Sequence, residues 1–90
     1  MRRAVITVLG KDMVGILAKV SAICAENSVN VLEVTQSVLQ DLFAMIMLVD
    51  ITDLKVPFSQ LIDSFSAMGK KENLTIHVMH EDIFDAMHKI

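Results

Sequence analysis

The residues best suited to chemistry lie in one short segment, Gly10-Lys11-Asp12-Met13-Val14-Gly15-Ile16. Its two glycines allow the backbone to bend and a ligand to approach closely. A helix that starts here presents free N–H groups and positive partial charge, which suit a carboxylate. Asp12 beside it suits an ammonium group. The segment therefore has the chemistry to hold a zwitterionic amino acid.

The same segment also has a purely structural interpretation. Gly10 can end a strand, Asp12 can cap a helix, and Gly15 can permit close packing. Caps and turns are commoner than ligand sites. Residue types alone leave both interpretations open.

Three histidines form the second group that could do chemistry. His77 and His80 are three residues apart and Glu81 follows, while His88 lies further along the tail. Imidazole and carboxylate groups are ligands for zinc or nickel. On a strand, however, residues three apart point to opposite faces, so this pair chelates only if the strand ends between them. We expect no metal site, and keep His77 and His80 as weak candidates.

The patterns typical of enzymes do not occur in the sequence. Cys24 lies on the apolar stripe of an expected helix, where a thiol is usually a small hydrophobic group with no neighbouring base. The Gly10 and Gly15 pair lacks the Gly-Lys-Ser/Thr ending of a phosphate-binding loop. We expect no catalysis and no cofactor.

Hydrophobic periodicity predicts seven elements that position these residues. In chain order we expect a strand at Arg3–Leu9, a helix at Val14–Asn27, strands at Val29–Leu39 and Leu42–Thr52 joined by Gln40-Asp41, a helix from Pro57 that stops at Gly69, a strand at Leu74–Met79 and a helix at Glu81–Ile90.

This order is the βαββαβ arrangement of an α+β, ferredoxin-like sandwich with an added C-terminal helix at about 81–90. Right-handed crossovers place both main helices on one face of a four-stranded antiparallel sheet. Residues 1–90 have the length of a single domain.

Composition favours a homo-oligomer. The chain is 53% apolar with a mean hydropathy of +0.54. A single domain of this size cannot bury that much apolar surface without a partner. The run Leu42–Val49 is apolar on both faces, so we expect helices to cover one face and a second copy the other. A dimer and a tetramer both fit, and an unusually aliphatic monomer is the alternative.

The charge and hydropathy patterns argue against nucleic acids and membranes as partners. The net charge is −3 and the eight cations are scattered, so the clustered charge that nucleic-acid binding needs is missing. The longest apolar run, Leu42–Val49, is too short to span a bilayer. No signal peptide is visible and Cys24 is the single cysteine, which fits a reducing cytoplasm. We expect a soluble, cytoplasmic protein.

The segment from Gly10 to Val31, G-K-D-x-x-G-I-L-A-K-V-S-A-I-C-A-E-N-x-V-N-V, resembles the opening of an ACT domain. Asp12, Gly15, Leu17 and Asn30 match that family's pattern, and Val14 stands where proline is frequent. The likeness is greatest to short, stand-alone ACT proteins that have a C-terminal helix and no assigned ligand.

This resemblance implies a non-catalytic regulatory module that binds an amino acid at a subunit interface and signals through a regulated protein partner. The residues that it nominates for the ligand are Gly10, Lys11, Asp12, Met13, Val14, Gly15, Ile16 and Asn30.

Two other functions stay open. One is a dimerising scaffold without a small-molecule ligand, which would bind through an exposed apolar sheet face that includes Met45 and Met47. The other is a metal-responsive domain that uses His77, His80 or His88.

Overall fold

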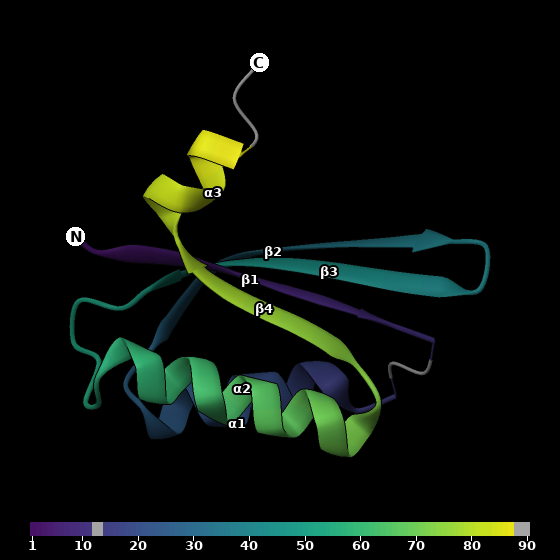
Figure 1. Cartoon of the computed structure of the whole chain (residues 1–90), viewed down its shortest axis with the longest axis horizontal. Coiled ribbons are helices and arrows are strands. Elements are labelled where there is room, and N and C mark those ends of the chain that lie inside the picture. The colour runs from purple at the N-terminus through teal and green to yellow at the C-terminus, as the bar shows by residue number, and fades with distance from the viewer. Residues whose placement is uncertain (12–13, 88–90) are drawn as a thin grey trace.

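The computed structural model describes residues 1–11 and 14–87, and the predicted order of elements is confirmed (Figure 1). The elements are β1 (Arg3–Gly10), α1 (Ile16–Glu26), β2 (Asn30–Leu39), β3 (Leu42–Asp50), α2 (Phe58–Glu72), β4 (Thr75–His80) and α3 (Glu81–Met87). The predicted end of the tail helix, residues 88–90, lies outside the described part. No helix within that part is both long enough and apolar enough to cross a membrane.

The four strands form one antiparallel sheet in the order β2-β3-β1-β4. Strand β1 is one of the two inner strands and pairs with β3 on one side and β4 on the other, so that Ile6 lies between Met47 and Val78. Helices α1 and α2 cover one face, and α3 stands on the opposite face, which we call the outer face (Figure 1). This is the ferredoxin-like sandwich that the sequence predicts.

The hydrophobic core lies between the sheet and the two main helices. Alternate residues of a strand point to the same face, so every second residue of β1 and β3 enters the core. The core residues with at most 2% exposure are Ala4, Ile6, Val8, Ile16, Val20, Cys24, Met45, Met47, Val49, Ile51, Leu61 and Phe65. Burial raises the pKa of the Cys24 thiol to about 11, so this cysteine packs as a hydrophobic group.

The position of Met45 and Met47 corrects one expectation. The sequence places them on an exposed sheet face, but both lie in the core at 1% and 0% exposure. Their strand is apolar on both faces, so alternation gives no sign of which half points to the helices. The outer face of β3 instead carries Leu42, Ala44 and Ile46.

The outer face is partly covered by the chain itself. Val5 points to this face and is 4% exposed, in the region where α3 contacts β1. Arg3 Nη2 lies 2.9 Å from Glu81 Oε2 and ties α3 to the sheet. Leu9 and Ile46 remain 39% and 43% exposed. The chain therefore covers one end of this face itself, through α3.

The sequence predicts that the helix from Pro57 stops at Gly69, and this prediction is wrong. Helix α2 continues to Glu72 and ends at Asn73, whose φ of 58° is left-handed and whose N–H donates to the Gly69 carbonyl. Asparagine tolerates that conformation and can end a helix. Gly69 has a different role, because a Cβ there would lie 2.8 Å from the Leu74 carbonyl oxygen.

We predict that Gly69→Ala destabilises the fold by about 1–3 kcal/mol, because the added methyl meets backbone rather than a flexible side chain. Helix propensity alone favours alanine by about 1 kcal/mol and predicts the opposite sign. Urea denaturation measures the difference, with Ser66→Ala on the exposed part of the same helix as the control. A Gly69→Ala protein more stable than the parent would contradict the close approach.

Candidate functional site

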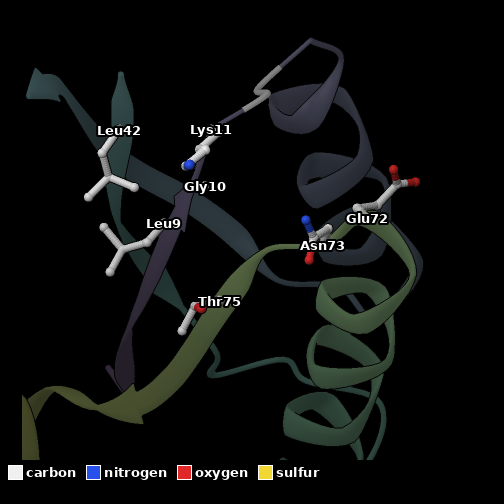
Figure 2. Close-up of a pocket in the computed structure, with 7 residues that line it drawn as sticks. All are labelled: Leu9, Gly10, Lys11, Leu42, Glu72, Asn73 and Thr75. Carbon is white, nitrogen blue, oxygen red and sulfur yellow. The ribbon is translucent and has the colours of Figure 1, made fainter. Parts of the chain in front are cut away.

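The end of β1 forms a hollow with two neighbouring parts of the chain. Leu9 pairs with Thr75 of β4 on one side, and Gly10 pairs with Phe43 of β3 on the other. The turn from α2 into β4 lies beside this end of the sheet (Figure 2). The hollow measures about 570 Å³ and is lined by Leu9, Gly10, Lys11, Leu42, Glu72, Asn73 and Thr75.

The polar groups of this hollow can bind a small carboxylate. Figure 2 shows Lys11 and Asn73 on opposite sides of the space, with Leu9 and Leu42 at the sheet. No acidic group of the described residues pairs with Lys11. A lysine ammonium, an amide and a hydroxyl beside two leucines provide charge, hydrogen bonds and apolar contact. The size and chemistry suit a small acid that has an apolar part.

Glu72 is already used by the fold. Its Oε1 accepts a hydrogen bond from Lys19 Nζ at 2.5 Å, which ties α1 to the end of α2. In Figure 2 its carboxylate points away from Lys11. Glu72 therefore fixes the wall of the hollow, and Lys11 is the charged lining group that no acid of the described residues pairs with.

The start of α1 differs from the expected capped helix. The N-cap residue is Gly15 with φ 73°, and no side chain of the described residues caps the helix. Nothing lies within 4 Å of a Cβ at Gly15, so backbone conformation, and not close packing, requires glycine here. Ile16 is 2% exposed and belongs to the hydrophobic core. Val14 is exposed, whereas Asp12 and Met13 lie outside the described residues and stay predictions.

Asn30 lies at the opposite end of the sheet from Gly10. It pairs with Asp50 of β3, which pairs with Arg3 at the start of β1. Gly10 is seven residues further along β1, a distance of roughly 23 Å at the rise of a strand. A single chain therefore brings Gly10 and Lys11 together but keeps Asn30 apart from them.

Asp50, which pairs with Asn30, has a carboxylate that is stabilised in its charged form. The Thr52 hydroxyl donates to Asp50 Oδ1 at 2.6 Å, and the Thr52 N–H donates to the same atom at 2.9 Å. These two hydrogen bonds lower the pKa of Asp50 below its ordinary value, with smaller help from the N-terminus and Arg3. Asp50 offers a fixed negative charge beside Asn30.

His77 and His80 do not come together. His77 pairs with Thr7 and points to the outer face, while His80 stacks on Phe58 of α2 with ring centroids 4.2 Å apart. The pair lies on opposite faces of β4, as strand geometry predicts. Residues 1–11 and 14–87 contain no group of three His, Cys, Asp or Glu side chains placed to hold a metal ion. His88 lies outside them.

Sequence reasoning missed Asn73 and Thr75 as lining residues. They are more than sixty positions from Gly10 and reach it only because β4 pairs with β1. The predicted topology contains that pairing, so the position of Thr75 beside the end of β1 could be inferred from the predicted fold. The position of the left-handed Asn73 could not be inferred, because the expected helix end was Gly69.

Comparison with known proteins gives a consistent result. The family model described as ACT domain matches residues 2–79. A UPF0237 protein of Methanocaldococcus jannaschii is 44% identical over 90 residues, which is 100% of both chains. An ACT domain protein from Streptococcus pneumoniae superposes with a TM-score of 0.80 at 39% identity, over 97% of this chain and 98% of that one.

The fold also occurs within larger proteins. Escherichia coli aspartokinase III, solved in complex with lysine and aspartate, matches with a TM-score of 0.55 at 21% identity, over 89% of this chain and 17% of that one. This likeness shows a shared fold.

We predict that Gly15→Ala destabilises the protein by about 1 kcal/mol, because alanine is strained at positive φ. Gly15→Asn should cost less, since asparagine tolerates the left-handed region. Urea denaturation of both variants measures the difference. Equal losses would contradict the backbone explanation and favour a contact made at this position.

We predict that Thr52→Ala raises the pKa of Asp50, measured by NMR titration of its carboxyl carbon. A depressed folded-state pKa stabilises the fold above the ordinary aspartate pKa, and that stabilisation is lost as pH falls through the folded value. The variant should therefore lose stability at neutral pH and lose less on acidification than the parent. Ser64→Ala, remote from Asp50, is the control, and an unchanged Asp50 pKa in Thr52→Ala would contradict the assignment.

Proposed function

This chain belongs to the ACT domain family, a family of regulatory small-molecule-binding modules, and we propose that it binds an amino acid at an interface between two copies of itself. It has no catalytic step of its own and acts on a regulated protein partner. The proposal treats residues 1–90 as one domain of the cytoplasm, where a free buried thiol such as Cys24 stays reduced.

The observation that carries the proposal is the separation of Asn30 from Gly10 and Lys11. Both groups belong to the set that the family pattern nominates, yet one chain holds them at opposite ends of its sheet. A ligand that contacts both sets needs a second copy to bring them together.

Strand β2 is the edge that can do this. Among the strands of the described residues its only neighbour is β3, and Leu32, Val34 and Val38 are 41%, 38% and 66% exposed. A long edge strand with exposed apolar side chains is a ready template for pairing with another chain. We take the edge of β2 as the contact between copies.

Antiparallel pairing of two β2 strands supports a shared site. In such a pair the first residue of one strand lies beside the last residues of the other. Val38, near the end of β2, is in the same row as Phe43 and Gly10. Asn30 of one copy would thus come to the end of the sheet that carries the Gly10 and Lys11 of its partner.

The chemistry of this position favours an amino acid. Lys11 and the N–H groups at the start of α1 suit a carboxylate. Asn30 supplies an amide, and the proposed role of Asp12 is to receive the ammonium group. The structural similarity to aspartokinase III, which was solved in complex with lysine and aspartate, supports an amino acid as the ligand.

A scaffold without a small-molecule ligand is the second candidate. The exposed Leu9, Leu42 and Ile46 on the outer face favour it, because contiguous apolar surface marks contact sites. It predicts stable association of copies that no amino acid changes.

We predict that one of the twenty amino acids raises the melting temperature by roughly 5–10 °C at ten times its dissociation constant. Val34→Lys should reduce both this shift and the dimer population, because it puts like charges near the two-fold axis. Ile62→Lys, on the exposed side of α2, is the matched control and should change neither. Differential scanning fluorimetry and sedimentation velocity give the two readouts.

The outcomes separate the two candidates. A stable dimer that no amino acid affects at millimolar concentration would contradict the sensor and support the scaffold. Amino-acid binding that survives in a Val34→Lys monomer would contradict the shared site.

A further inference from the structure

The outer face has an apolar floor that α3 leaves partly open. Ala44, Ile46 and Leu48 of β3 point to this face, beside Val5 and Leu9 of β1. Two adjoining hollows of about 230 and 290 Å³ lie here and share Ile46 and Phe84. We call this region the outer groove; its floor is formed by Val5, Ala44, Ile46 and Leu48, and its walls by Glu33 and Thr35 of β2 and by Phe84 and Asp85 of α3.

The two walls of the outer groove carry the same sign of charge. Glu33 on β2 and Asp85 on α3 are exposed on either side of the floor, and neither forms an ion pair within the described residues. Glu81 also lines the groove, but Arg3 neutralises it. Among residues 1–11 and 14–87, no lysine or arginine lines either hollow. An occupant gains most if it brings apolar side chains to the floor and cations to both walls.

The charge pattern discriminates among occupants. A second copy docked here in a two-fold arrangement would bring its own Glu33 and Asp85 close to the Glu33 and Asp85 of the first copy, and these like charges would repel one another. An anionic lipid surface would be repelled for the same reason. The floor from Ala44 to Leu48 is about 13 Å long, which matches roughly nine residues of a helix.

From this geometry we propose that the outer groove binds a short basic amphipathic segment of another protein. Apolar side chains of the segment lie on Ile46 and Leu48, while its lysines or arginines pair with Glu33 and Asp85. Helices that lay an apolar face in a groove are a common mode of recognition. The groove uses the outer face and not the edge of β2, so it does not depend on pairing of copies.

The test uses the full chain and two labelled probes in fluorescence anisotropy. One is an amphipathic leucine–lysine peptide of about twelve residues, long enough to cover the floor as a helix. The other has glutamate in place of every lysine. We expect the lysine peptide to bind and the glutamate peptide not to bind.

Variants locate the binding. Glu33→Gln with Asp85→Asn removes both wall charges and should weaken binding of the lysine peptide roughly two- to thirtyfold, the size expected for two exposed ion pairs. Ile46→Gln should weaken it roughly tenfold by removing apolar contact. Asp63→Asn with Ile62→Gln changes the same kinds of residue on the exposed side of α2 and should have no effect.

Three results would overturn the proposal. They are the absence of binding by the lysine peptide, equal binding of both peptides, and equal weakening by the control pair on α2. If the lysine peptide fails to bind and Ile46→Gln dissociates the copies in sedimentation, the groove is instead a contact between copies. Circular dichroism of each variant shows that the fold is kept.

Discussion

The unpaired edge of β2 is the constraint on which the functional account depends. Ten residues, Asn30–Leu39, form a strand that pairs with β3 on one side and with no other strand in the described part of the chain. Backbone N–H and C=O groups along such an edge are satisfied by water or by another chain. The exposed Val34 and Val38 add apolar area to that edge. The same strand starts at Asn30 and ends level with Gly10, so the edge also decides which residues can share a ligand.

The two surfaces proposed for this protein meet on β2. Its edge is the proposed contact with a second copy, and its Glu33 forms one wall of the outer groove. A ligand that favours paired copies would hold β2 in one arrangement, and any surface that differs between arrangements would respond. A lone domain can pass on the presence of an amino acid in this way without a catalytic step.

Local pattern predicted much of the fold, because strand and helix periods differ clearly in this chain. The alternation in β1 places Ala4, Ile6 and Val8 on one face, and the structure has them there. The pattern could not orient β3, where Met45 and Ile46 are both apolar and only packing against the helices decides which is buried. The helix end at Asn73 was missed because glycine is the commoner terminator, and Gly69 is needed for the approach of Leu74. For the site, the resemblance to ACT domains nominated Lys11 but could not find Asn73, whose place depends on a pairing between distant strands.

The most direct test of the shared site is amide hydrogen exchange along β2, measured by NMR at increasing protein concentration. The account predicts that amides of Asn30–Leu39 that point away from β3 exchange slowly at high concentration, and that the ligand slows them further. Dilution should return them to fast exchange, while amides of β1 stay protected throughout. Fast exchange of those β2 amides at millimolar protein, with ligand present, would contradict the pairing and with it the shared site.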